Sequence, residues 1–270
     1  MKLPKVSCIC ATRGRFASLC ESVSFFILQD YPNKELIILN NHPVDIEPHP
    51  DLVKHNIKVI NVGDRSGYSM NRIYNEILNY ISDDSELVSI WDDDDAYFPW
   101  FLSDNINKLI NSSKRGIRSR AVYWQDDINN NYITIESNVL ESSMIIYRDN
   151  IFYSDVQHSD TDIHFGCPHL PWVASLQENE KFLYNNDITL MFRWNYEHMY
   201  HHLQSVGPHK NIEDSGKDQL LKPVKIDHVF KKIPGNIKQT LKEGIPSTID
   251  NEERAALFLQ FLNSNIELFN

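Results

Sequence analysis

Four consecutive carboxylates at residues 92–95 are the part of this sequence whose residue types and spacing most clearly predict chemistry. Adjacent acids repel one another and lower stability unless a positive charge lies among them. Carboxylate oxygens are the ligands that hard divalent cations such as Mg²⁺ and Mn²⁺ prefer. An ordinary solvated acidic turn is the alternative, so the position of the run in the fold decides between these interpretations.

The residues around the acidic run predict that it ends a buried strand. Residues 87–91 are a short apolar run typical of such a strand. Pro99 precedes an amphipathic stretch that should begin a helix at or just beyond it. Open α/β sheets bind their ligands at the carboxyl ends of strands. This position favours a divalent cation that bridges to a phosphate-bearing substrate.

Strands and helices that alternate in the first part of the chain predict a parallel sheet. Apolar segments typical of short strands cover residues 6–11, 35–39 and 57–62. Apolar residues at helical spacing cover residues 16–28 and 68–80. Later strands are expected at residues 121–124, 132–135, 143–147 and 188–194.

Two passages of the chain resemble the family 2-type glycosyltransferases with the GT-A fold. The acidic stretch reads hydrophobic–Asp–x–Asp–Asp–x–x–x–Pro–x–x–Leu and resembles the family's DxD region. A second passage resembles the family's Gln-x-Tyr-Pro-x-x-Glu segment, which it matches at Gln29, Tyr31, Pro32 and Glu35. The resemblance covers roughly residues 4–202. It implies a Rossmann-like α/β fold with a mixed, mostly parallel sheet flanked by helices.

The resemblance implies an enzyme that moves a sugar from a nucleoside-diphosphate sugar to an acceptor hydroxyl, with Mn²⁺ or Mg²⁺ as cofactor. A UDP-sugar is the favoured donor. Asp94 aligns with the last acid of the DxD motif and is the expected metal ligand, while Asp92 or Asp93 would orient the ribose or a metal-bound water. Asp95 is expected to lie behind these direct contacts. The cation would stabilise the negative charge that the departing diphosphate gains.

Further donor contacts are expected in the loops that follow the predicted strands. Thr12 and Arg15 are kept in a loop that otherwise departs from the family's pattern, and with Asn40 they would frame the nucleotide. Asn40 replaces an acid of the family, which leaves the donor base open because an amide both donates and accepts hydrogen bonds. Arg65 and Asn71 match the family's passage beside the diphosphate. An ordinary loop residue is the alternative for Arg65.

Candidates for the acceptor side lie further along the chain. The family carries an acid that serves as general base in inverting members, and Asp160 and Asp162 both fit its position. Either residue could instead be a helix N-cap. A late histidine of the family closes over the metal or the diphosphate. His202 is the expected ligand, with His198 and His201 as alternatives.

Composition limits the classes of partner. The net charge of −11 argues against a broad nucleic-acid-binding surface, although residues 114–120 and 222–242 are locally basic. The first of these segments is interpreted either as a solvated loop or as a contact for a phosphate-rich acceptor or the donor diphosphate. Neither a signal peptide nor a membrane span is expected. Cys8 and Cys10 fit buried thiols of a reducing cytoplasm.

We therefore expect a GT-A domain over residues 1–205, with a nucleotide-binding half at 1–111 and an acceptor half at 112–205. Residues 206–270 lie beyond the resemblance and are expected to form a small helical C-terminal appendage. The main prediction is a cytoplasmic glycosyltransferase with a glycan acceptor. One alternative is a phage enzyme in the host cytoplasm that glycosylates hydroxymethylated pyrimidines in DNA. Others are a non-catalytic nucleotide-binding protein and a nucleotidyltransferase, against which the glycine-poor first loop counts.

Overall fold

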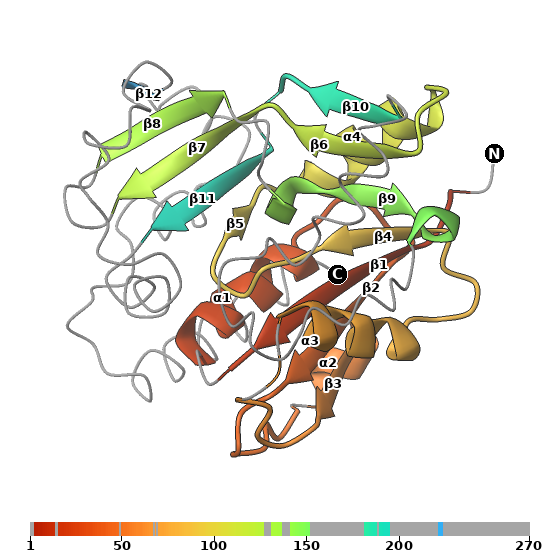
Figure 1. The fold of residues 1–270 in the computed structure, drawn as a ribbon, viewed down its shortest axis with the longest axis vertical. Helices are drawn as coiled ribbons and strands as arrows, with labels where there is room; N and C mark the ends of the chain where they lie inside the picture. Colours follow the sequence, from red (N-terminus) through yellow and green to blue (C-terminus); the bar gives the residue numbers. More distant parts are fainter. Residues whose placement is uncertain are drawn as a thin grey trace.

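In the computed structural model, the described part of the chain is an α/β core with a second, smaller sheet beside it (Figure 1). The described residues are 3–13, 16–48, 50–66, 68, 70–126, 131–136, 141–151, 181–187, 189–194 and 221–223. Within these residues, segments with the hydrophobic period of a strand form strands, and segments with the period of a helix form helices.

One half of the central sheet is parallel. β1 (Val6–Thr12) pairs in parallel with β2 (Lys34–Asn40) on one side and with β4 (Leu87–Ile90) on the other. β3 (Ile57–Asn61) continues the sheet beyond β2, also in parallel. These four strands confirm the strands predicted at the start of the chain. Their carboxyl ends lie at one edge of the sheet, where the acidic run follows β4.

The other half of the sheet brings in later segments of the chain and makes the sheet mixed. β9 (Ile145–Tyr147) is antiparallel to both β4 and β6 (Gly116–Ser119). β10 (Phe182–Asn185) pairs in parallel with β6. The strand order is β10-β6-β9-β4-β1-β2-β3. This arrangement confirms the mostly parallel α/β sheet that the sequence predicts.

Helices cover both faces of the sheet. α1 (Phe16–Ile27) and α4 (Phe101–Ile110) pack on one face. α3 (Met70–Ile77), which continues as η1 (Leu78–Tyr80), packs on the other. A short helix, α2 (Asp51–Lys54), precedes β3. Because side chains alternate along a strand, β1 contributes to both core clusters and forms the middle of the molecule.

A second sheet has the order β12-β8-β7-β11-β5. β7 (Ala121–Asp126) and β8 (Asn131–Glu136) form the expected antiparallel pair. β11 (Leu190–Trp194) is parallel to β7 and antiparallel to β5 (Ala96–Tyr97), a two-residue strand that directly follows the acidic run. β12 (Leu221–Pro223) pairs with β8.

Residues 114–120 and the C-terminal extension each contain a strand, β6 and β12. The interpretation of residues 114–120 as a solvated loop is wrong for β6, whose four residues are all buried because β9 and β10 pair on its two sides. β12 belongs to the predicted C-terminal extension. The remainder of that extension, residues 206–220 and 224–270, lies outside the described residues, so its helical character stays a prediction.

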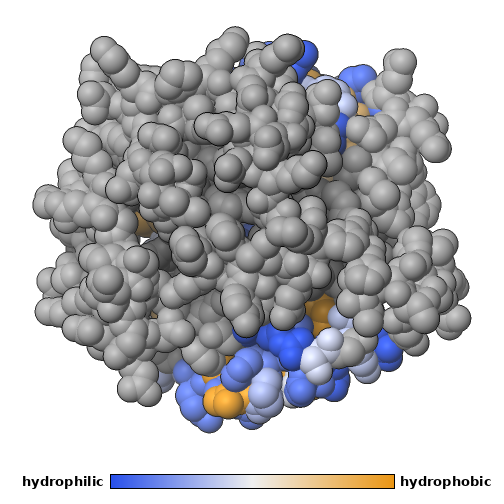
Figure 2. Space-filling model, turned by 60° about the vertical axis from the view of Figure 1, so that its left-hand side comes forward, coloured by the Kyte–Doolittle hydropathy of each residue, from blue (hydrophilic) through white to orange (hydrophobic). Residues whose placement is uncertain are grey.

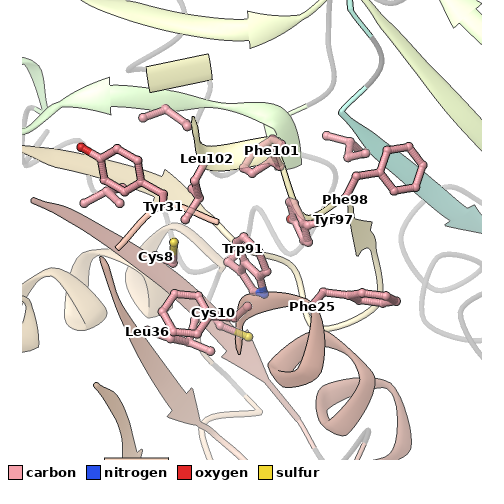
Figure 3. Packing of buried hydrophobic residues seen from close by; sticks show 14 of the residues in the cluster. Cys8, Cys10, Phe25, Tyr31, Leu36, Trp91, Tyr97, Phe98, Phe101 and Leu102 are labelled. Atoms are coloured by element: carbon pink, nitrogen blue, oxygen red, sulfur yellow. The ribbon is translucent and has the colours of Figure 1, made fainter. Parts of the chain in front are cut away.

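Trp91, the last residue before the acidic run, lies in the middle of the larger core cluster (Figure 3). Its ring stacks on Tyr97 with centroids 3.8 Å apart and meets Phe26 and Phe101 edge-on at 5.7 and 6.0 Å. The indole Nε1 donates a hydrogen bond of 3.3 Å to the carbonyl of Ser22 in α1. Aromatic pairs of this kind contribute about 0.5–1.5 kcal/mol each beyond area burial. The start of the acidic run is therefore fixed in a rigid core.

The passage that resembles the family's Gln-x-Tyr-Pro-x-x-Glu segment has a structural role. The Gln29 amide donates to the carbonyls of Phe25 and Phe98 at 3.0 and 2.8 Å, and it accepts from the backbone N–H of Leu102 at 3.0 Å. The Tyr31 hydroxyl donates to the carbonyl of Pro4 at 2.6 Å. Gln29 thus joins the end of α1 to the segment that follows the acidic run.

The described surface is polar with isolated apolar side chains. Val44 and Val53 are exposed, and the described residues coloured in Figure 2 are mostly hydrophilic with a small hydrophobic area among them. Single exposed apolar residues are normal for soluble domains. Inside, Cys8 and Cys10 are buried free thiols, as predicted. Among the described helices, none combines the length and the apolar character that crossing a bilayer would require.

Glu35 joins three segments at the amino-terminal ends of the strands, opposite the acidic run. Its buried carboxylate accepts hydrogen bonds from Ser7 Oγ at 2.6 Å, from Ser82 N and Oγ at 2.8 and 2.6 Å, and from Lys58 Nζ at 3.2 Å. Burial by itself would raise the pKa of Glu35, but these hydrogen bonds outweigh it and lower the pKa. The charged form is therefore the stabilising one.

Replacing Glu35 should make the protein less stable in a pH-dependent way. Glu35→Gln is expected to lower the free energy of unfolding at neutral pH by about 1–3 kcal/mol, since hydrogen bonds to a buried charge are lost. Because the pKa of Glu35 is lower in the folded protein than in the unfolded chain, its ionised carboxylate stabilises the folded state at pH values above the unfolded pKa. This contribution disappears as the pH falls through the folded pKa. Denaturant titrations should show the difference shrinking below about pH 4. Glu86→Gln, at an exposed glutamate, is the control; a difference that stays constant down to about pH 3 would contradict this account.

Candidate functional site

The acidic run forms a bend between β4 and β5 that is held from three directions. The backbone N–H of Asp92 donates to the Tyr97 hydroxyl at 2.8 Å, and the Asp92 carbonyl accepts from Ser22 Oγ at 2.9 Å. The Tyr74 hydroxyl donates to Oδ1 of Asp92 at 2.9 Å. Ser22 belongs to α1 and Tyr74 to α3, on opposite faces of the sheet. The helices on both faces therefore fix Asp92, α1 through its backbone carbonyl and α3 through its carboxylate.

Three of the four carboxylates converge. Asp92, Asp94 and Asp95 each offer an oxygen, and these oxygens all lie within 4.8 Å of one another. Asp95 is 1% exposed, whereas Asp92 and Asp94 are half-buried. Asp93 is also buried but does not belong to this group. A set of carboxylate oxygens at this spacing fits a hard divalent cation, which would also offset their mutual repulsion.

The two tyrosines that contact Asp92 stay protonated at ordinary pH. Burial raises the pKa of Tyr74 well above its usual value, and the negative charge of Asp92 raises it further. Burial likewise raises the pKa of Tyr97, followed by the charges of Asp92 and Asp95. The Tyr74 hydroxyl is therefore a permanent hydrogen-bond donor to the carboxylate.

A second group of polar side chains lies beyond the ends of the parallel strands. Thr12 Oγ1, Asn41 Oδ1 and Arg65 Nε are buried atoms for which the described structure has no hydrogen-bond partner. The backbone of Asn41 joins the three residues, because its N–H donates to the carbonyl of Thr12 at 3.0 Å and its carbonyl accepts from the N–H of Arg65 at 3.3 Å. Buried polar groups normally have partners. Three such atoms in residues that contact one another are suited to accept hydrogen bonds from, or donate them to, a polar ligand.

Both arginines at this place lie beside carboxylates. The guanidinium of Arg65 lies 3.9 Å from the carboxylate of Glu76 in α3 and over the ring of Tyr68. In the neighbouring loop, Arg13 pairs with Asp64 at 3.2 Å, which ties the segment after β1 to the segment after β3. Both arginines thus hold loops together at the edge of the sheet where the acidic run lies.

Asn40, predicted to contact the nucleotide, uses its side chain within the protein. Its amide group donates to the carbonyl of Val44 and to Oδ1 of Asn61, both at 2.9 Å, and its Oδ1 accepts from the N–H of His42 at 3.2 Å. Asn40 therefore shapes the turn after β2. Its neighbour Asn41 is the residue of this pair whose side-chain oxygen has no hydrogen-bond partner in the described part of the chain.

The other predicted site residues are placed as follows. Thr12 and Arg65 lie together near the carboxyl edge of the sheet, and Asn71 is the second residue of α3, at the end of the helix near Arg65 in the sequence. Nothing further is described of the Asn71 side chain. The remaining candidates lie outside the described residues and stay predictions: Arg15, Asp160, Asp162, His198, His201 and His202.

Sequence reasoning did not single out Asn41, Tyr74 or Tyr97. Tyr74 falls on the apolar stripe of its helix and is indeed buried, so its hydroxyl could be assigned no role from the pattern. Tyr97 follows the acidic run by two residues, and this proximity could have indicated a contact between its hydroxyl and the run. Asn41 could not be separated from Asn40, because both are amides at the end of one strand.

Comparison with known proteins supports the fold. No family model matches the sequence, and no curated protein matches it. Among solved structures, S. aureus TarS residues 1–349 in complex with UDP is similar with 13% identity, a TM-score of 0.55, and coverage of 98% of this chain and 83% of that chain. The same TarS fragment in complex with UDP-GlcNAc gives 13% identity, a TM-score of 0.53, and coverage of 97% and 73%.

The full TarS structure is similar with 15% identity, a TM-score of 0.51, and coverage of 98% of this chain and 50% of TarS. The chain thus spans half the length of TarS, a glycosyltransferase with the GT-A fold. At these identities the likeness establishes the fold, and it confirms the GT-A resemblance predicted from the sequence.

Tyr74 provides a test of how the acidic bend is positioned. Tyr74→Phe removes the hydrogen bond to Asp92 and should weaken Mn²⁺ binding by about tenfold or more, as is usual when a partner of a metal ligand is lost. Electron paramagnetic resonance of free Mn²⁺ measures this affinity directly. Tyr80→Phe, whose hydroxyl lies at the far end of the same helical segment, is the matched control. Equal Mn²⁺ affinities for the two variants would show that Tyr74 does not position the carboxylates.

Proposed function

We propose that this protein is a metal-dependent glycosyltransferase that moves a sugar from a nucleoside-diphosphate sugar, with a UDP-sugar preferred, to a hydroxyl of a glycan acceptor. The observation that carries this proposal is the convergence of three carboxylate oxygens within 4.8 Å at the carboxyl edge of a GT-A sheet. TarS, which has the same fold, has been crystallised with UDP and with UDP-GlcNAc. A nucleotide sugar is the ligand that this combination fits best.

The carboxylates of Asp92, Asp94 and Asp95 would hold Mn²⁺ or Mg²⁺. Such an ion, when bound, stabilises negative charge on the departing diphosphate. The protein's own contribution is to keep the three oxygens close despite their repulsion, through the hydrogen bonds that Tyr74 and Ser22 give to Asp92. In the transfer, the bond from the anomeric carbon to the diphosphate oxygen breaks and a bond from that carbon to the acceptor oxygen forms. The acceptor proton passes to a base, for which Asp160 and Asp162 remain the candidates.

The proposed division of labour follows the order of the strands. Residues 1–111 supply the donor side, with the unsatisfied atoms of Thr12, Asn41 and Arg65 next to β1 and β2. Residues 112–205 supply the acceptor side. The acidic bend lies between them because β4 is the strand where the two halves of the sheet meet.

The unsatisfied oxygen of Asn41 favours particular bases. A buried amide oxygen that accepts no hydrogen bond needs a donor from the ligand. The ring nitrogen N3 of uracil and thymine carries a hydrogen, whereas N3 of cytosine accepts. Arg65 beside Asn41 supplies a positive charge that suits phosphate. The pair therefore fits UDP or TDP, in which the base can donate its N3–H to Asn41.

The first test is ligand-dependent thermal stability. UDP with Mn²⁺ should raise the melting temperature of the wild-type protein, since a ligand at about 100 times its dissociation constant adds about 2.7 kcal/mol of stability. Asp94→Asn keeps the shape of the side chain but loses its charge and should abolish the Mn²⁺-dependent part of the rise. Asp45→Asn, at an exposed acid, should not. Absence of stabilisation by any nucleoside diphosphate would exclude the proposed activity. Nucleotide binding without sugar transfer would identify a non-catalytic relative.

A second test separates the two neighbouring asparagines. Asn41→Ala should weaken UDP binding about tenfold, because one hydrogen bond in a buried site is lost, and should leave the stability of the free protein unchanged. Asn40→Ala should instead lower the free energy of unfolding by about 1–3 kcal/mol, because it leaves buried partners unsatisfied. Isothermal titration calorimetry and urea denaturation measure the two effects. If Asn40→Ala weakened UDP binding more than Asn41→Ala at equal stability, the assignment would be reversed.

A further inference from the structure

Arg118 is a buried cation that forms no ion pair with any carboxylate in the described part of the chain. It is the third residue of β6 and is 2% exposed. Its Nη2 donates to the hydroxyl of Tyr184 at 3.1 Å, and its guanidinium lies 5.1 and 5.0 Å from the ring centroids of Phe182 and Tyr184. Its Nε is buried and has no hydrogen-bond partner among the residues that the structure describes. Among the described residues, no carboxylate pairs with it.

The other cations of the same basic segment are accounted for differently. Arg115 forms an ion pair with Asp149 and lies over the ring of Tyr147. Arg120 is exposed to solvent. A buried charge with no partner is costly, and aromatic rings offset only part of that cost. Within the described residues, Arg118 thus differs from Arg115 and Arg120 in being buried without a carboxylate beside it.

The sheet places Arg118 near the acidic bend and on its acceptor side. Ser89 of β4 and Ile117 of β6 both face Ile145 of β9, so Ile90 and Arg118 occupy the next row together. β6 runs parallel to β4, because β9 is antiparallel to both, and the two strands end at the same edge. With strands spaced about 4.8 Å apart, the two backbones are separated by about 10 Å. The acidic bend begins two residues after Ile90.

Arg118 also projects from the face of the sheet that α3 covers, where Tyr74 contacts the bend. Its contact Phe182 belongs to the core cluster packed against α3, as do Ile90 and Tyr74. The residues proposed for the nucleotide lie next to β1 and β2, on the other side of β4. An anion at Arg118 would therefore lie across the metal-binding group from the nucleotide.

We infer that Arg118 and Tyr184 bind an oxyanion, a phosphate or carboxylate group, of the acceptor substrate. The guanidinium supplies charge and a free Nε–H donor. The Tyr184 hydroxyl accepts from Arg118 and keeps its own proton to donate. Tyr184 is 37% exposed, so the residue that contacts the buried guanidinium also reaches solvent. The assignment of the anion to the acceptor rests on the proposed function. The anion site itself is inferred from the burial and contacts of Arg118 alone.

Inorganic phosphate is the probe for this site, with chelator present to remove metal and with chloride added to keep the ionic strength constant. Phosphate affinity is measured by calorimetry on the full chain. Arg118→Met should weaken it about tenfold or more, since charge-assisted hydrogen bonds are lost, and Tyr184→Phe should weaken it to a lesser extent. Arg120→Met is the matched control and should bind as the wild type does.

A second readout separates binding from a purely structural role. If Arg118 binds a ligand, the melting temperature of Arg118→Met without phosphate should be no lower than that of the wild type, because the substitution removes an uncompensated buried charge. A lower melting temperature together with unchanged phosphate affinity in Tyr184→Phe and Arg118→Lys would overturn the proposal and leave a structural cation–π contact. Equal losses in Arg120→Met and Arg118→Met would also overturn it, as binding by diffuse charge. Binding of UDP with Mn²⁺ is measured in the same variants and should be unaffected by Arg118→Met. If the wild-type protein did not bind UDP with Mn²⁺, the proposed function would be refuted, whereas the phosphate measurements would still decide the anion site.

Discussion

Repulsion between adjacent carboxylates is the force that the centre of this structure has to resist. A run of four aspartates would separate if it lay on a mobile loop. Here the residue before the run, Trp91, is buried between α1 and Tyr97, and the first aspartate is hydrogen-bonded from both faces of the sheet. The carboxylates are consequently held at a spacing that a divalent cation can use. The rest of the fold can be understood as the support for this bend.

The Gln-x-Tyr-Pro-x-x-Glu passage contributes to that support without taking part in chemistry. Gln29 fixes the chain beyond the acidic bend through the carbonyl of Phe98 and the N–H of Leu102, while Glu35 joins strand ends at the opposite edge. This passage contributed most to the resemblance found in the sequence. It is tied to the fold because it fixes the chain next to the bend.

Satisfied and unsatisfied polar groups are distributed unevenly between the two edges of the sheet. At the amino-terminal edge, both carboxylate oxygens of Glu35 accept hydrogen bonds from neighbouring side chains and backbone. At the carboxyl edge, buried polar atoms of Thr12, Asn41 and Arg65 on one side of β4, and of Arg118 on the other, have no hydrogen-bond partner among the described residues. Leaving such groups unpaired lowers stability. Their concentration around the acidic bend is what a site for a polar, charged substrate requires.

The sequence by itself determined the parallel half of the sheet and the helices that cover it, because strand and helix periods are local properties of consecutive residues. It also determined that an acidic group lies at the end of a strand. Only the tertiary structure decided which side chains are left to bind a ligand. Asn40 and Asn41 are indistinguishable in sequence, and they differ because Asn61, from the next strand, occupies the amide of the first. Arg118 could be placed within the sheet only by its neighbours β9 and β10, which come from later in the chain. Hydrogen-bond satisfaction depends on contacts between distant segments, and the local pattern of residues does not contain that information.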